Sequence, residues 1–316
     1  MLEPFYGTLQ PDTAAPDAAQ IFYVSNETGT GRVMVCPVFP GAELCYNDMH
    51  LAWCNQAQRA AQNVIEINHC RVGRYECSFG ENSCCYLAAG DFAISAGTRK
   101  KSCSSFPLQH YHGITILLDL DALTPEMHRQ LQWFGIDLAA IRQYICTANR
   151  CCILRSDPAI ETLFAQLYAA YPAQHSGFFR LKVLELLLLL SRLETRNEVQ
   201  QTDYFNQQQA ACAKRVAALL TQDLTCHRTI EQLAQEVELS PTALKQCFKG
   251  VYGSSIYAYL REYRLQTAQK LLTESALSVA DIAHRIGYEN PNKFSSAFHA
   301  RYGITPTEYR KGCPNG

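Results

Sequence analysis

The chain has 316 residues and is almost neutral, with 28 Lys and Arg against 29 Asp and Glu. This length exceeds that of one small domain, so two domains are expected. From Ala210 onward, 13 basic residues stand against 9 acidic ones, whereas the part before it has 15 basic and 20 acidic residues. The basic part favours a nucleic-acid partner. The first residues lack a signal-peptide pattern and the apolar run 186–190 is too short to span a bilayer, so a cytoplasmic location without a membrane partner is expected.

Short segments rich in Val, Ile, Tyr and Cys fill the first 120 residues or so and are separated by Gly, Asn and Pro. This pattern predicts strands of a β-sandwich or barrel, and residues 1–124 are therefore expected to form a β-rich domain. The predicted strands cover residues 21–24, 32–38, 64–70, 74–79, 84–87, 91–96 and 113–120.

Fifteen cysteines are present, and their spacing offers no zinc framework, because Cys84-Cys85 and Cys151-Cys152 are adjacent and no pair of Cys-x-x-Cys units occurs. Most are expected to be reduced thiols that serve as small buried side chains. A thiol-based redox or metal sensor is the alternative.

Four residues in the β-rich part are candidates for a metal site. His110 and His112 would lie on one face of a strand, and His69 and Glu76 could add an imidazole and a carboxylate. Residues 107–113 also fit a polar approach to the next strand with unliganded histidines, so no metal and no cofactor are predicted. Neither a Gly-x-Ser-x-Gly elbow nor a Walker loop occurs, and an enzyme with catalytic residues is not expected.

Residues 125–194 are predicted to be helical, with helices at 158–171 and 177–194. The second is apolar nearly all round at its centre, so it must bury more than one face, against the β domain or against a second subunit. The polar, Gln- and Asn-rich segment 195–207 reads as a linker. A DNA-binding domain is expected at 208–316.

One pattern occurs twice in that last domain, at 229–249 and 278–299, and each copy predicts a helix-turn-helix unit. Capping residues and first-turn prolines mark the helix starts, namely Thr229 with Gln232, Ser240-Pro241, Ser278 with Asp281, and Asn290-Pro291. Between the copies, residues 254–272 predict a helix about 28 Å long. This approaches one turn of B-DNA, roughly 34 Å, so one chain could present two helices to successive major grooves.

The last hundred residues or so resemble the AraC/XylS-type transcriptional regulators. The resemblance is carried by Ile282-Ala283, Gly287-Tyr288, Phe294, Phe298, Gly303, Thr305-Pro306 and Tyr309-Arg310. The chain departs from the family at Glu238, where a glycine is frequent in the first turn. The resemblance implies a cupin-like effector-binding barrel in the N-terminal domain, followed by helices that commonly dimerise.

Residues that contact DNA should lie on the solvent face of each recognition helix, just after its cap. The base-reading candidates are Thr242, Lys245 and Gln246, which match the family's base-contacting positions, and Asn292, Lys293, Ser295 and Ser296 in the second unit. The second set is short and weakly charged, so more phosphate contact is expected there. The candidates for backbone contact are Lys249, Arg301 and Lys311.

The sequence thus predicts an α+β protein, β-rich first and all-α last. The expected function is a sequence-specific DNA-binding transcriptional regulator that responds to a small effector. Its expected partners are promoter DNA, RNA polymerase if it is an activator, the effector and a second copy of the chain. The alternative is a cupin-type metalloenzyme, or a metal or redox sensor domain, fused to a DNA-binding module.

Overall fold

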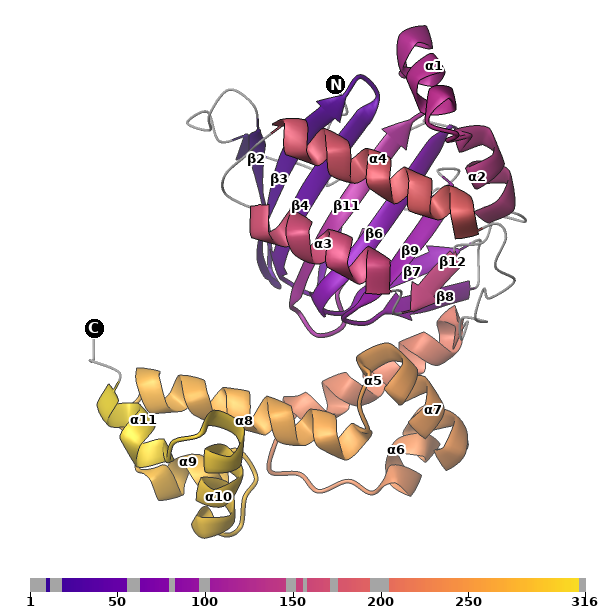
Figure 1. Cartoon of the computed structure of the whole chain (residues 1–316). Coiled ribbons are helices and arrows are strands. Elements are labelled where there is room, and N and C mark those ends of the chain that lie inside the picture. The colour runs from indigo at the N-terminus through magenta and orange to yellow at the C-terminus, as the bar shows by residue number, and fades with distance from the viewer. Residues whose placement is uncertain are drawn as a thin grey trace. The chain divides into compact units, whose positions relative to one another are not determined.

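A computed structural model describes residues 10–11, 19–55, 63–79, 83–96, 103–145, 152–155, 158–170, 176–193 and 205–312 (Figure 1). The chain divides into two compact units, residues 1–206 and 207–316. Most of the predicted linker, residues 195–204, lies outside the described residues. Its last part differs from the prediction, because Phe205–Asn206 forms a short strand that pairs with the first unit and Gln207 already begins a helix.

The first unit contains two antiparallel sheets. The strands are β1 Gln10–Pro11, β2 Gln20–Asn26, β3 Gly29–Phe39, β4 Ala42–His50, β5 Trp53–Asn55, β6 Val64–Gly73, β7 Tyr75–Phe79, β8 Ser83–Leu87, β9 Asp91–Ala96, β10 Cys103–Ser105, β11 Tyr111–Asp119, β12 Cys152–Arg155 and β13 Phe205–Asn206. The larger sheet has the order β1-β2-β3-β4-β11-β6-β9-β12, and the smaller one β13-β8-β7-β10-β5. The β-rich prediction is confirmed, and all seven predicted segments are strands.

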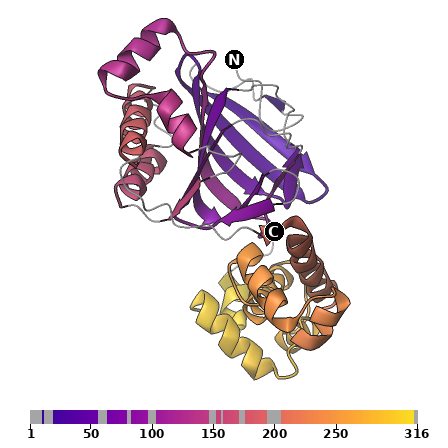
Figure 2. The ribbon, with the colours of Figure 1, turned by 90° about the vertical axis from the view of Figure 1, so that its right-hand side faces the viewer.

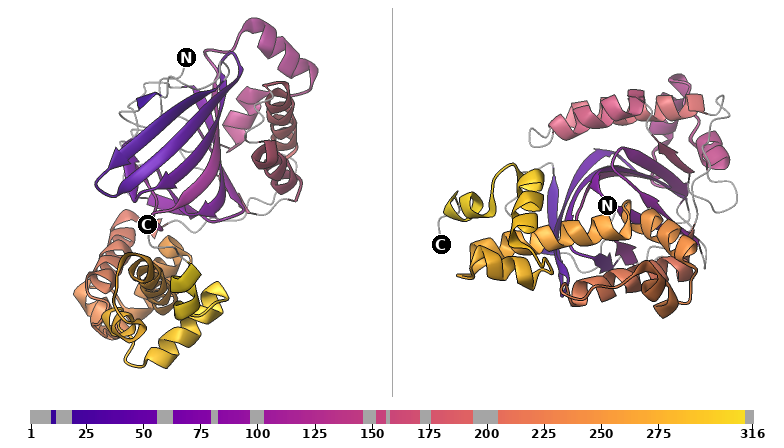
Figure 3. Two further views of the ribbon diagram at one scale, coloured as in Figure 1. Left: turned by 90° about the vertical axis from the view of Figure 1, so that its left-hand side faces the viewer. Right: turned by 90° about the horizontal axis from the view of Figure 1, so that it is seen from below.

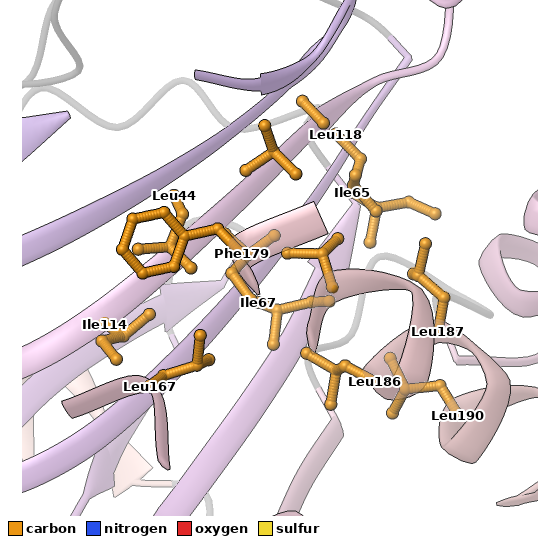
Figure 4. Close-up of a cluster of buried hydrophobic side chains, with 14 of the residues drawn as sticks. Leu44, Ile65, Ile67, Ile114, Leu118, Leu167, Phe179, Leu186, Leu187 and Leu190 are labelled. Carbon is orange, nitrogen blue, oxygen red and sulfur yellow. The ribbon is translucent and has the colours of Figure 1, made fainter. Parts of the chain in front are cut away.

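Four helices lie on one side of the larger sheet (Figures 1 and 2). They are α1 Pro125–Trp133, α2 Leu138–Ile145, α3 Pro158–Ala170 and α4 Ser176–Leu193, of which α3 and α4 run across the face of the sheet. Side chains of α3 and α4, among them Leu167, Phe179 and Leu186, pack on Leu44 and Ile67 of the sheet (Figure 4). In the described part of the chain, no helix is both long and apolar enough to cross a membrane.

A second core lies between the two sheets. It joins Val33 and Cys45 of the larger sheet to Tyr75, Cys77 and other residues of the smaller one. Because side chains alternate along a strand, one face of β4 and β11 packs on the helices and the other on this inter-sheet core. The first unit is therefore built in three layers, helices, larger sheet and smaller sheet.

The second unit is all-helical. Its helices are α5 Gln207–Gln222, α6 Ile230–Glu236, α7 Pro241–Tyr252, α8 Ile256–Glu274, α9 Val279–Arg285, α10 Pro291–Tyr302 and α11 Pro306–Gly312. The long helix α8 runs from the group formed by α5, α6 and α7 to the group formed by α9, α10 and α11 (Figures 1 and 3). The predicted joining helix at 254–272 is confirmed, with a start and end two residues later.

Candidate nucleic-acid interface

The two short helices that open each unit carry the predicted capping boxes. The Thr229 hydroxyl accepts from the Gln232 amide at 3.2 Å, and the Gln232 side chain accepts from the Thr229 amide at 2.8 Å. Ser278 and Asp281 make the same reciprocal pair at 3.1 and 3.3 Å. Both helix starts are thus fixed by side chains only three residues away.

The second helix of each unit starts at a capped proline, as predicted. Ser240 Oγ accepts from the Ala243 amide at 3.2 Å. Asn290 Oδ1 reaches a nearer donor, the Asn292 amide, at 2.8 Å. Both helices end at a glycine in the left-handed conformation, with φ of 75° at Gly253 and 77° at Gly303. The repeat is therefore matched at both ends of α7 and α10.

The turns between the helices also match, although their residues differ. Glu238 has a φ of 56° and Gly287, its counterpart in the second unit, a φ of 82°. In the first turn, the Leu239 amide donates to the Ala234 carbonyl at 3.0 Å. In the second, the Tyr288 amide donates to the Ala283 carbonyl at 2.9 Å. Glu238 therefore adopts the conformation that glycine adopts more easily, and the turn geometry is kept.

Gly287 is required for a second reason, which is crowding. A Cβ at this position would lie 1.9 Å from the Leu224 carbonyl oxygen and 2.6 Å from the Arg264 guanidinium. Arg264 itself donates to that same carbonyl at 2.6 Å. This contact ties α8 to the segment before α6, and the second turn packs directly on it.

The base-reading candidates of α7 lie where the sequence places them. Thr242, Lys245 and Gln246 are exposed, whereas Leu244 and Phe248 are buried. Three polar side chains with different hydrogen-bonding capacity thus share the outer surface of a helix that is held by its other face. Their contact with bases remains a prediction.

A smaller share of the candidate side chains is exposed on α10 than on α7. Asn292, Lys293 and Ser296 are exposed, but Ser295 is half-buried and its hydroxyl donates to the Pro291 carbonyl at 3.0 Å. That hydroxyl already has a partner inside the helix, which the sequence did not indicate. The second unit therefore offers a shorter set of side chains to a ligand.

The three candidates for phosphate contact differ in their surroundings. Lys249 and Lys311 are exposed. Arg301 instead forms an ion pair with Glu262 of α8, with Arg301 Nε 2.9 Å from both carboxylate oxygens. Hydrogen bonding to Glu262 raises the pKa of Arg301, and the same bond lowers the pKa of Glu262. A phosphate contact at Arg301 would compete with this pair.

The metal candidates of the first unit are not brought together as a set. His69 stacks on Phe164 at 4.1 Å, and its Nδ1 lies 3.0 Å from the Tyr168 hydroxyl. Burial lowers the pKa of His69 to about 4, so the ring is neutral at pH 7. Glu76 accepts a hydrogen bond from the Tyr86 hydroxyl at 3.0 Å.

His110 and His112 do meet, but their third partner is His50. Within the described ranges, these three histidines form the group whose ligand atoms all lie within 4.8 Å of one another. His50 was missed because β4, the strand that it ends, was not predicted. The polar residues of β4 interrupt the alternation of apolar and polar side chains that marks a strand. The spacing Asp48-x-His50, which repeats that of His110-x-His112, is the signal that could have found it.

Eight of the cysteines in the described part of the chain are buried. Burial raises the pKa of Cys36 and of Cys70 to about 12. A thiol with so high a pKa is a poor nucleophile and a poor redox sensor. These cysteines fit the expected role of small core side chains.

Two capped helix pairs with left-handed turns, joined by one long helix, define a double helix-turn-helix domain. Residues 233–312 match a family model described as a helix-turn-helix domain. The AraC-type resemblance of the C-terminal part is thereby confirmed.

The chain is 34% identical over 105 residues to the HTH-type transcriptional activator RhaR of Enterobacter sp. (strain 638), which covers 33% of this chain and 37% of RhaR. It is 28% identical over 158 residues to the arabinose operon regulatory protein of Escherichia coli (strain K12), covering 49% and 52% of the two chains. The chain thus matches less than two thirds of the length of either relative. Among solved structures, the C-terminal domain of AraT, a response regulator from Geobacillus stearothermophilus, is similar at 28% identity, covering 32% of this chain and 84% of that one with a TM-score of 0.31.

Proposed function

We propose that this protein is a sequence-specific DNA-binding transcriptional regulator. The observation that carries the proposal is the pair of recognition helices, α7 and α10, with matched caps and exposed polar residues on each. Helix α8 has 19 residues. It is therefore about 28 Å long, close to the spacing of successive major grooves. The names of the relatives, an activator and an operon regulatory protein, support the same function.

Within this function, α7 reads bases and α10 mainly contacts the backbone. Lys245 can donate to O6 and N7 of guanine, and Gln246 can pair with adenine through two hydrogen bonds. Asn292, Lys293, Ser295 and Ser296 offer short or weakly charged groups, which suit phosphate oxygens as well as base edges.

The first test is selection of duplexes from a random pool by the purified full chain. We expect an enriched site with two recognised segments about 10 base pairs apart. No enrichment over random sequence would overturn the proposal of sequence-specific binding.

Two lysines of one helix then separate base reading from backbone contact. Lys245→Ala should weaken binding to the selected site by about 1–3 kcal/mol and relax the preference at one base pair. Lys249→Ala should weaken binding to all duplexes alike and reduce the dependence of log K on log salt by about 1. Equal losses by Lys245→Ala on selected and random duplexes would refute its base-reading role.

The first unit is proposed to bind a small polar effector between its two sheets. A row of buried polar side chains supports the effector proposal. It consists of Asn47, Thr115, Asn68 and Glu66 and lies on the inter-sheet face of the larger sheet. The Asn47 side-chain amide donates to the Thr115 hydroxyl at 2.8 Å. The Thr115 hydroxyl in turn donates to Asn68 Oδ1 at 2.7 Å. Asn68 donates to the buried carboxylate of Glu66 at 2.6 Å. A carboxylate at the end of such a row suits a ligand with hydroxyl or amino donors.

Thermal unfolding of the full chain with a panel of polyols and amines tests this effector proposal. A ligand at 100 times its dissociation constant stabilises the unit that binds it by about 2.7 kcal/mol. Glu66→Gln should weaken that shift, and Glu161→Gln, an exposed change on α3, should not. A panel without any stabilising compound would contradict a polar effector of these classes.

We further propose that the chain activates transcription and self-associates through α4. Leu181 of α4 supports self-association, because this large apolar side chain is 67% exposed. Leu181→Glu should shift the sedimentation of the full chain from dimer to monomer. Transcription with purified RNA polymerase from a promoter carrying the selected site tests activation.

A further inference from the structure

The histidine cluster of the first unit is built by two neighbouring strands. His112 pairs in register with Asp48, and Tyr111 with Met49, so β4 ends where β11 begins. Asp48 and His50 are two residues apart on β4, and their side chains share one face. His110 lies directly before β11. Three imidazoles and one carboxylate therefore meet at one end of the β4–β11 pair.

The distances within this cluster fit a shared ligand. His50 Nδ1 and His110 Nδ1 are 3.3 Å apart. The ring centroids of the three histidines are separated by 5.0, 5.6 and 4.7 Å. With metal–nitrogen bonds of about 2.0–2.1 Å, two ligands of a tetrahedral ion lie about 3.3–3.4 Å apart. The nearest two nitrogens already have that spacing.

Asp48 gives an independent indication. Its Oδ1 lies 2.8 Å from His50 Nε2 and 3.0 Å from His112 Nε2. An imidazole that donates its Nε2–H to this carboxylate presents its Nδ1 as the acceptor nitrogen, the form in which histidine binds a metal ion.

We propose that His50, His110 and His112 bind a divalent transition-metal ion, with Asp48 orienting His50 and His112. Imidazole ligands favour ions such as Zn²⁺ over Mg²⁺ or Ca²⁺, which prefer oxygen. A carboxylate behind a ligating histidine fixes the tautomer and the ring orientation. The side chain of His50 is 54% exposed and that of His112 36%, so a fourth position of the ion faces solvent.

This site is distinct from the proposed effector site. Asp48 and His50 alternate with Asn47 along β4, and they share the face of Tyr46, which packs on the helices. The polar row that contains Asn47 and Glu66 lies on the opposite face, between the sheets. The first unit would then bind a metal ion and an effector on two sides of the same strands.

Zinc binding to the full chain tests the proposal, by equilibrium dialysis with Zn²⁺ in the presence of a non-thiol reductant and elemental analysis of the bound metal. Wild type should retain one Zn²⁺ more per chain than the triple variant His50→Asn, His110→Asn, His112→Asn. His128→Asn, at an exposed histidine of α1, is the matched control and should behave as wild type. Asp48→Asn should weaken this binding by about 10- to 100-fold.

Cobalt reports which side chains are involved, because Co²⁺ bound by thiolates gives an intense charge-transfer band that imidazole ligands do not give. We expect a Co²⁺ spectrum without this band in wild type and its loss in the triple variant. The proposal is overturned if the triple variant retains as much Zn²⁺ as wild type, if Mg²⁺ competes equally, or if all bound Co²⁺ shows the thiolate band. Circular dichroism of the triple variant establishes that the fold is kept, and His112→Gln alone provides a milder change with the same expected direction.

Discussion

Replacement of Gly287 by alanine tests why the second turn of the repeat needs glycine while the first accepts glutamate. Gly287 has a φ of 82°, and an added Cβ would meet the Leu224 carbonyl oxygen at 1.9 Å. An L-residue in the left-handed region costs about 1–2 kcal/mol. Forcing an extra methyl group into a packed contact costs about 1–3 kcal/mol more. Gly287→Ala should therefore destabilise the second unit by about 2–5 kcal/mol, a large share of the 5–15 kcal/mol typical of a domain.

Two matched changes separate the backbone cost from the crowding. Gly303 has a φ of 77°, but a Cβ there would have nothing within 4 Å, so Gly303→Ala should cost only about 1–2 kcal/mol. Glu238→Gly removes the left-handed cost from the first turn and adds about 0.5–1 kcal/mol of chain entropy. Its net effect should be a gain of about 1 kcal/mol or less.

Hydrogen exchange of the full chain, followed by mass spectrometry of peptides from α6, α7, α9 and α10, measures these effects. The free energy of opening should fall most for Gly287→Ala, less for Gly303→Ala, and rise slightly for Glu238→Gly. If Gly287→Ala were no worse than Gly303→Ala, crowding against Leu224 would not constrain this turn. The reasoning from close approach would then be refuted.

Three further outcomes follow from the same structure. Gln246→Ala should relax the preference at one adenine-containing pair of the selected site, measured by competition between duplexes. Gln266→Pro, at an exposed position inside α8, should break the helix and lengthen or abolish the footprint, whereas Gln266→Ala should leave it unchanged. His69 is neutral when folded and its pKa is about 4, so the unfolded chain binds an extra proton between pH 6.5 and 4. The free energy of unfolding of the first unit should fall by about 3 kcal/mol over that range and less in His69→Gln, as followed by urea titration with the fluorescence of Trp53 and Trp133.

The second unit could be predicted from the sequence because its determinants are local. Thr229 and Gln232, three residues apart, settle a helix start without any distant contact. The left-handed turn at Glu238 was not predictable in the same way, because glutamate, unlike glycine, has no preference for the left-handed conformation. Only the matching position of Gly287 hinted at it.

The first unit was less predictable because its determinants lie far apart in the chain. Strand β4 contains Asn47, a residue type that is common in turns. Its side chain is buried, and a hydrogen bond to Thr115, 68 residues later, satisfies its amide. A polar residue of this kind becomes a strand residue only when its partner is in place. His50 was missed for the same reason, because its neighbours His110 and His112 lie about 60 residues later in the chain.

The two recognition helices share a skeleton but differ in how far their polar groups are already engaged. On α10, the hydroxyl of Ser295 and the guanidinium of Arg301 bind within the protein. An exposed ion pair such as Arg301–Glu262 contributes only about 0–1 kcal/mol to stability. Its effect is therefore mainly geometric, because it joins α10 to the helix that sets the spacing from α7. The side chains of α10 that hold it against α8 are therefore consistent with the proposed backbone contact, and the exposure of Lys245 and Gln246 is consistent with the proposed base reading.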